Sequence, residues 1–497
     1  MKTNIFFVAF LFFYSSIFSQ TQLQSLISTG SNQLWNMEFA AAEKTFDRII
    51  KLKPDSPVGY YYYAKIHFWI YLGSHNESEY KTFIKFADLA QQKIDKSLEN
   101  NPKDYFVNYI AGNLYSFRAM QQGSSNSSVD AFYSSKKAVK YFEQTLEINP
   151  KFYDAYLGLG LFDYTMSFVP DFLKWAVNLT GLSSDKVRGF NYIKLAYKKG
   201  IQDKAEASFH LSKIYTDYLA EYDSAFIHLR SLNAQYPNNV LFIYQYAVSL
   251  IKDRQLDKAV ELLTRVIKIN NKYLPQVTAL AHYRMGEIYF KKNLFTAAIT
   301  QYDKFLELTK ELDYTGWAAF NSALCCKFLG NEEEYKKKLL QAKNGNQDVF
   351  EDSYAKLKSE KYLANGINKN DLKLFKIKNY LDDGKYQVVY DSLKNFIEKI
   401  DNNESKAIAY TYFCEAAVNL KKYSVASYAA DQTELLKLSS EKWTLALSIF
   451  LKAKVKFLTG NKKAAKDLLL ASESKNDNEF KDYIQSQIEW LKRQLKR

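Results

Sequence analysis

The chain has 497 residues, 47% of them hydrophobic, and contains 17 Gly and 7 Pro. This composition provides enough apolar surface for a long packed core, which excludes disorder for most of the chain, and it leaves few residues for the tight turns of a sheet protein. Lys and Arg total 68 against 54 Asp and Glu, and the net charge of +14 suits an acidic protein, an anionic lipid or an acidic polymer as a partner.

Residues 1–20 have the order of a secretory signal peptide, with a basic start at Lys2, an apolar run from Ile5 to Tyr14 and a small, polar end. We therefore expect cleavage near Gln20 and export to the periplasm or cell envelope, where nucleic acid is a poor partner. No Cys lies in this segment, so the thiol of a lipoprotein anchor is missing. No later segment reaches the roughly 18 consecutive apolar residues of a membrane span. The mature protein is expected to be soluble and not lipidated.

Helical hairpins are predicted to follow one another from residue 23 onward. In the first hairpin, Gly30 and Ala42 are the small residues that let two helices cross closely, and the ring of Phe46 fills the space beside them. The period is broken at three places, which predicts insertions at hairpin tips. These insertions lie near residues 74–80, 121–130 and 165–184.

From Ala205 the period runs almost without interruption, and the clearest copy of the hairpin lies at residues 279–312. Gly286 and Ala298 are its small residues, and rings such as Tyr302 surround the crossing. Two helices that cross at small residues bury the same faces in every copy. The repeat therefore predicts stacked helical hairpins instead of strands.

The period slips between Phe350 and Asn370, which predicts a local bend or an offset between two halves of the array. Hairpins resume at Asp371 and end in a terminal amphipathic helix. The apolar face of this helix is predicted to cover the last exposed hairpin. That face carries Phe480, Tyr483, Ile484, Ile488 and Leu491.

Small residues at two fixed positions, rings beside them and a period near 34 residues together resemble the tetratricopeptide repeat (TPR). The resemblance implies an all-α fold, a TPR-like right-handed superhelical solenoid of about eleven helical hairpins with a C-terminal capping helix. We expect an N-terminal array over residues 21–349, and a C-terminal TPR-like array with the capping helix over residues 350–497. The abundance of Lys, Asn, Tyr and Ile resembles that of exported proteins from Bacteroidetes-type bacteria.

Rings dominate the groove-facing positions of the first three hairpins. These positions carry Trp35, Tyr61, Phe68, Trp69, Tyr109, Asn113 and Phe117. Two interpretations are open: an aromatic trough that holds a partner, or packing inside the core. Many TPR proteins bind a peptide carboxylate with a clamp of Lys and Asn. Asn113 fits that clamp, but Tyr109 and Leu161 stand where other members belong, so the clamp is not carried over.

Patterns of catalysis and metal binding are missing from the sequence. The five His residues never occur in an HExxH or Cys-His spacing, and the sequence has no phosphate loop, GxSxG motif or dinucleotide fingerprint. We therefore predict no enzyme activity, no metal and no cofactor. Cys325, Cys326 and Cys414 are expected as buried free thiols, with a disulfide framework as the alternative.

The insertion Ser167–Ser184 is the most apolar departure from the repeat after the N-terminal segment. Over residues 167–196 the chain resembles a segment of the eukaryotic inclusion-body-clearance family of TPR proteins, except that Ser184 replaces an expected Gly. The matching residues are Ser167, Pro170, Gly181, Asp185 and Gly189. The resemblance implies a shared hairpin shape and no activity. We expect the insertion to plug the superhelix and bury Trp175; docking of a partner or of a membrane surface are the alternatives.

The sequence thus predicts an exported TPR scaffold that mediates protein–protein or protein–peptide interaction in the cell envelope. The partner would be a protein or an extended peptide. The alternative is a basic envelope-surface protein that binds anionic lipid or polysaccharide through its charge.

Overall fold

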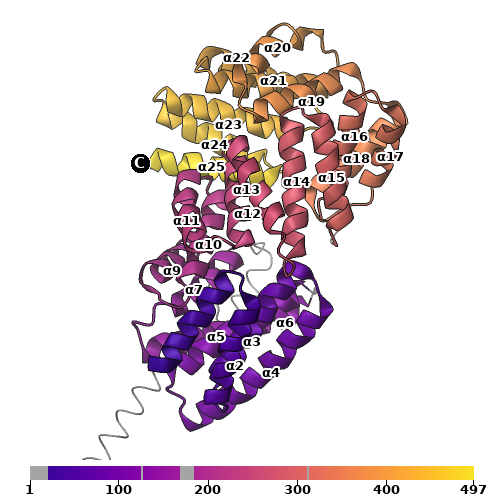
Figure 1. Cartoon of the computed structure of the whole chain (residues 1–497). Coiled ribbons are helices and arrows are strands. Elements are labelled where there is room, and N and C mark those ends of the chain that lie inside the picture. Colours follow the sequence, from indigo (N-terminus) through magenta and orange to yellow (C-terminus); the bar gives the residue numbers. More distant parts are fainter. Residues whose placement is uncertain (1–20, 125–126, 168–183, 311–312, 479, 497) are drawn as a thin grey trace, which may run out of the picture. The chain divides into compact units, whose positions relative to one another are not determined.

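The computed structural model describes residues 21–124, 127–167, 184–310, 313–478 and 480–496 (Figure 1). Every regular element in these ranges is a helix, which confirms the predicted all-α fold. None of the described helices combines the length and the apolar character that crossing a lipid bilayer requires. The predicted signal peptide and the insertion around Trp175 lie outside the described residues, so the predictions made for them stay predictions.

The chain divides into two compact units. The first comprises Met1–Ser212, Ile227–Phe242 and Lys272–Leu274. The second comprises Lys213–Phe226, Ile243–Asn271 and Pro275–Arg497. The boundary expected from the sequence, after residue 349, falls inside the second unit.

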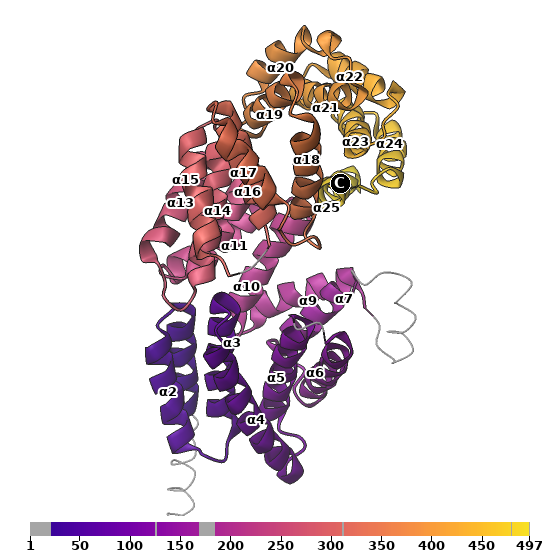
Figure 2. The same cartoon turned by 90° about the vertical axis from the view of Figure 1, so that its right-hand side faces the viewer.

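Antiparallel hairpins build the first unit (Figure 2). It opens with a helix over residues 21–35. Its further helices are α2 (Phe39–Leu52), α3 (Pro57–Ser74), α4 (Glu77–Asn100), α5 (Tyr105–Ser124), α6 (Ser128–Ile148), α7 (Ala155–Met166), α9 (Lys186–Lys199) and α10 (Lys204–Lys213). Parts of α11 (Tyr222–Gln235) and α12 (Val240–Lys252) belong to each unit.

The second unit continues the array of hairpins. It begins with a π-helical turn, Ile214–Tyr218. Its helices are α13 (Leu256–Ile269), α14 (Pro275–Lys291), α15 (Phe295–Leu308), α16 (Thr315–Phe328), α17 (Glu332–Ala342), α18 (Phe350–Asn365), α19 (Lys369–Asp382), α20 (Tyr386–Lys394), α21 (Asn403–Asn419), α22 (Tyr423–Leu435), α23 (Trp443–Leu458), α24 (Lys462–Ser474) and α25 (Lys481–Lys496). A short 3-10 helix, Ile397–Lys399, follows α20.

Small residues let the helices of a hairpin cross closely, as the sequence predicts. A Cβ atom added to Gly30 would lie 2.5 Å from the Phe46 ring, and one added to Gly286 would lie 2.7 Å from the Tyr302 ring. Both distances are too short for packed atoms, because protein interiors are already filled to crystal-like density. The ring therefore occupies the space that a larger side chain would need.

The extra residues expected near 74–80 lengthen the second hairpin. α3 has 18 residues and α4 has 24, and only His75 and Asn76 separate them. His75 adopts the left-handed conformation with a φ of 52°, and the Asn76 side chain caps α4 by accepting a hydrogen bond from the Ser78 N–H. Two longer helices joined by a tight turn thus account for this departure from the period.

A single helix explains the slip of the period near residue 350. α18 stands between the hairpins α16–α17 and α19–α20 and packs against both α16 and α17 (Figure 2). Because α18 adds one helix where the repeat would add two, the frame resumes with α19 displaced in sequence.

The terminal helix α25 caps the array, as predicted. Its buried residues Ile484, Ile488 and Leu491 lie on the predicted face, and Leu495 extends it. The prediction is wrong for Tyr483, which is 50% exposed. Tyr483 lies beside Ile484 in sequence, about 100° around the helix, so it faces the edge of the contact.

The three cysteines are buried and free, which confirms the expectation for them. Burial raises the pKa of the Cys325 and Cys414 thiols. Both therefore stay protonated at neutral pH and behave as small apolar side chains.

Candidate functional site

The rings predicted to form an aromatic trough lie close together in the first unit. Trp35 lies edge-on to Trp69 with ring centroids 5.6 Å apart, and Phe117 stacks on Phe68 at 4.6 Å and on Tyr61 at 6.0 Å. Most of the cluster is closed to solvent. Five of the seven residues are buried, namely Trp35, Tyr61, Phe68, Tyr109 and Phe117, while Trp69 and Asn113 are half-buried.

Later segments of the same unit pack against these rings. Trp35 stacks on Phe242 with centroids 5.8 Å apart, and Phe242 also contacts Phe209 of α10 at 5.3 Å. Leu232 and Tyr236 complete this buried cluster. Asn113 donates a hydrogen bond to the Tyr109 carbonyl within its own helix. Side chains of the chain itself occupy the space that the trough interpretation gives to a partner. Partner binding by these rings stays a prediction.

A buried charge network holds α10 in place. Lys65 of α3 lies 2.8 Å from the Glu206 carboxylate and 3.5 Å from that of Asp203. The Tyr109 hydroxyl also donates to Asp203. Burial alone would lower the pKa of Lys65, but the two carboxylates raise it, so Lys65 stays charged. Because Lys65 serves both carboxylates and the Tyr109 hydroxyl also donates to Asp203, the network links α3, α5 and α10 inside the unit.

A pocket in the second unit remains open. It holds about 430 Å³ of empty space, part of it continuous with solvent, and its lining comes from α18, α19, α21 and the start of α23. Tyr354 and Glu441 are 87 positions apart in sequence, yet both line this pocket. The pocket therefore exists only once the hairpins have stacked.

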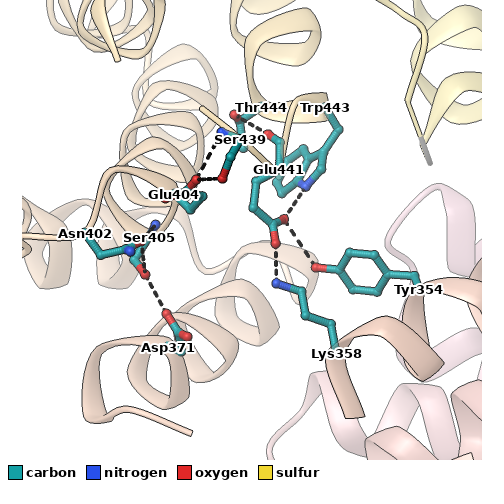
Figure 3. A network of polar contacts seen from close by, with 10 residues as sticks. All are labelled: Tyr354, Lys358, Asp371, Asn402, Glu404, Ser405, Ser439, Glu441, Trp443 and Thr444. Carbon is teal, nitrogen blue, oxygen red and sulfur yellow. Dashed lines mark hydrogen bonds and ion pairs between the residues drawn. The ribbon is translucent and has the colours of Figure 1, made fainter. Parts of the chain in front are cut away.

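One wall of the pocket is a buried ion pair between Lys358 of α18 and Glu441, which precedes α23 (Figure 3). The Trp443 indole N–H donates to the same carboxylate at 2.8 Å, and the Tyr354 hydroxyl donates at 3.4 Å. Three donors thus satisfy Glu441, whose backbone has a positive φ of 55°. The pair ties α18 to the hairpin α23–α24.

Two carboxylates stand on the opposite wall (Figure 3). Asp371 of α19 accepts a hydrogen bond from the Ser405 hydroxyl at 2.6 Å, and Glu404 of α21 accepts from the Ser439 hydroxyl at 2.7 Å and from its N–H at 3.1 Å. The bonds from Ser439 lower the pKa of Glu404, so it is ionised at neutral pH. Among the described residues, neither carboxylate forms an ion pair.

Apolar groups and one hydroxyl complete the lining. Leu374, Phe375 and Tyr412 contribute the apolar surface. Tyr362 is only 3% exposed and stacks on Phe320 at 6.3 Å. Burial, with Asp371 and Glu441 nearby, raises the pKa of Tyr362, so its hydroxyl keeps its proton. That hydroxyl has no hydrogen-bond partner in the part of the chain that the structure describes.

No pattern in the sequence singles out this pocket. Lys358, Asp371, Glu404 and Glu441 each read as ordinary helix-surface charges when taken alone. The slip of the period near residue 350 is the one signal, because an extra helix must pack somewhere. No cluster of three or more His, Cys, Asp or Glu side chains within the described ranges is arranged to hold a metal ion.

Residues 279–311 match a family model described as tetratricopeptide repeat. The match covers most of the hairpin α14–α15, in which Gly286 crosses against the Tyr302 ring. This chain contains a tetratricopeptide repeat. Its hairpins bury small residues and rings at the crossings, as the TPR pattern requires.

Several solved structures resemble the chain at low identity. The quorum sensor NprR from B. thuringiensis is 14% identical with a TM-score of 0.34, covering 84% of this chain and 98% of its own. A tetratricopeptide repeat protein from Parabacteroides merdae is 14% identical with a TM-score of 0.26, and the match covers 57% of this chain and 99% of that protein. Yeast Tom70 is 14% identical with a TM-score of 0.24, and the match covers 96% of each chain. No curated protein matches the chain. At these scores the likeness assigns no partner to this TPR protein.

Proposed function

We propose that this TPR protein binds another protein or an extended peptide in the cell envelope, after export. The open pocket between α18, α19, α21 and α23 is the observation that carries the proposal. It combines an apolar floor with a few convergent polar groups, which is the usual composition of a binding pocket. Side-chain pockets on stacked repeats suit an extended polypeptide, because successive repeats can each hold a different side chain.

Site-specific photo-crosslinking tests the binding proposal. A photo-reactive phenylalanine analogue in place of Phe375, on the pocket wall, should trap a discrete polypeptide in the native envelope. The same analogue in place of Leu470, which is 62% exposed on α24, serves as the control. The trapped polypeptide should also bind the purified chain. Equal trapping at both positions, or none at Phe375, would contradict the proposal.

The order of charges and apolar residues in segment 1–20 supports the location. Mass spectrometry of the protein from an envelope fraction should find an N-terminus near Gln20 and no lipid adduct. An intact Met1 or a lipid on the chain would contradict export as a soluble, unlipidated product.

The net charge of +14 supports a second candidate, contact with anionic lipid or polysaccharide. Ionic contacts at a surface weaken strongly as salt rises, since the screening length falls to about 8 Å near physiological ionic strength. Co-sedimentation with anionic vesicles should therefore disappear between low and moderate salt. Binding of the polypeptide partner in the pocket should persist.

A further inference from the structure

We propose that the pocket of the second unit holds a positively charged Lys or Arg side chain of the bound polypeptide. Asp371 and Glu404 would be its anions, and the Tyr362 oxygen would accept a further hydrogen bond from it. This inference rests on the proposed function, because it names the chemistry of that partner.

The charges that line the pocket favour a cation. Glu441 is already neutralised by Lys358, which leaves Asp371 and Glu404 as two carboxylates without an ion-pair partner in the described parts of the chain. Lys361 is the remaining cation of the lining, and it is exposed at the rim, where water and salt screen its charge. The pocket is thus locally acidic in a chain whose net charge is +14.

The hydroxyl of Tyr362 is a second observation that suits a ligand with hydrogen-bond donors. The Tyr362 side chain is 3% exposed and lines the pocket. Its hydroxyl has no hydrogen-bond partner among the described residues. A bound ammonium or guanidinium group has donors to spare and would satisfy both the hydroxyl oxygen and the two carboxylates.

The shape of the pocket suits a long side chain with a charged end. Leu374, Phe375 and Tyr412 offer apolar surface to the methylene stem of Lys or Arg. A peptide carboxylate, the ligand of the Lys and Asn clamp, would instead meet Asp371 and Glu404 as like charges.

Calorimetry with three matched peptides tests the charge preference of the full chain. The probes are acetyl-Ala-Ala-X-Ala-Ala-amide with X as lysine, norleucine or glutamate. Norleucine keeps the stem of lysine and removes its charge, so we expect it to bind about tenfold more weakly, since two charge-assisted hydrogen bonds are lost. Equal binding of the lysine and norleucine peptides, or tighter binding of the glutamate peptide, would overturn the proposal.

Substitutions in the pocket test the residues. Asp371→Asn with Glu404→Gln should lower the affinity for the lysine peptide about tenfold or more while the melting temperature changes little. Tyr362→Phe removes only the hydroxyl and should lower the affinity for the lysine peptide by less than the double variant does. Asp401→Asn, which removes the same charge from an exposed position just before α21, is the matched control and should have no effect. Unchanged affinity in the double variant would overturn the assignment.

Two further outcomes separate this inference from the function on which it rests. If n-butylamine competes as well as the lysine peptide, the ligand is a free amine and the polypeptide side chain is rejected. If the lysine peptide fails to bind while crosslinking at Phe375 persists, the result supports the proposed scaffold function and rejects the proposal of a cation pocket. Failure of both would reject the proposed function itself.

Discussion

Buried carboxylates close backbone loops in both units. Asp154 accepts hydrogen bonds from the N–H groups of Ile201, Gln202 and Asp203 through one oxygen at 2.8–2.9 Å. In the second unit, Asp352 accepts from two backbone N–H groups that lie far apart in sequence. Burial raises the pKa of each carboxyl to about 6, although the N–H donors act in the opposite direction. Loops that a single side chain holds are sensitive to that one residue.

Glycine substitutions at and away from a helix crossing should have opposite effects. A Cβ atom on Gly160 of α7 would lie 2.8 Å from the Gly189 carbonyl oxygen of α9, so Gly160→Ala must push these helices apart and should cost about 1–3 kcal/mol. A Cβ on Gly123 would meet no described atom within 4 Å, so Gly123→Ala should be neutral or stabilise α5 by up to about 1 kcal/mol. Urea unfolding measures both. Equal effects would contradict the close crossing.

His228 should make stability depend on pH. It is buried, its Nδ1 lies 3.0 Å from the Ser208 hydroxyl, and burial lowers its pKa from 6.5 to about 4. Below pH 6.5 the unfolded chain therefore takes up a proton that the folded chain does not. Stability should fall as the pH drops from 6.5 toward 4, with a slope of up to about 1.4 kcal/mol per pH unit.

The slope attributed to His228 is measured as a difference between two proteins. Asp154 and Asp352 have raised pKa values, so they act with the opposite sign over part of the same range. Urea unfolding of the wild type and of His228→Gln at several pH values cancels their contribution. The same slope in both proteins would contradict the lowered pKa of His228.

At the scale of elements, buried charges fasten two helices to partners that are distant in sequence. α10 is tied to α3 through Lys65, and α18 is tied to the start of α23 through Lys358 and Glu441. A buried ion pair contributes little net stability, but removing one partner leaves the other charge uncompensated. Such pairs therefore specify where each of these helices packs.

The ion pair of α18 should show this asymmetry. Lys358→Met leaves the Glu441 carboxylate buried without a cation and should cost about 3–5 kcal/mol in urea unfolding. The double variant Lys358→Met with Glu441→Leu should recover much of that loss. Lys361→Met, on the exposed side of the same helix, controls for the change in helix propensity. A single variant as stable as the wild type would mean that α18 is not anchored by this pair.

The two interpretations of the aromatic cluster can be separated by one substitution. Tyr61 is 0% exposed and packs against Phe117, so Tyr61→Ala should destabilise the first unit by about 3–5 kcal/mol, as other ring deletions in cores do. Thermal unfolding measures the loss. If stability is kept and partner binding is lost, the rings serve as a trough and the covering helix α10 must move away.

At the scale of the whole molecule, contacts distant in sequence decide where the second unit begins. Arg254 forms an ion pair with Glu415, and its guanidinium also donates to the Tyr386 hydroxyl. Arg493 of the capping helix lies 3.0 Å from Glu221. The C-terminal hairpins therefore depend on residues that precede them by more than a hundred positions.

Fragments with different starting points test this dependence. A fragment of residues 213–497 keeps the partners of Arg254 and Arg493 and should fold as a helical, protease-resistant unit. A fragment of residues 350–497 starts at the boundary expected from the sequence, but it lacks α16 and α17, on which α18 packs. Its circular dichroism should show less helix per residue. Equal helicity and protease resistance in the two fragments would favour the boundary after residue 349.

The sequence by itself determined the hairpins, because their small residues and rings recur at fixed spacing and act on neighbours in the same repeat. Gly286 and Tyr302 can be paired from the repeat alone. Only the tertiary structure decided what covers Trp35 and which charges meet Glu441. Those partners come from segments far along the chain, and no local period encodes which of them will meet. Rings that line an open groove and rings that pack in a core follow the same pattern in sequence, because both lie on the apolar face of a helix.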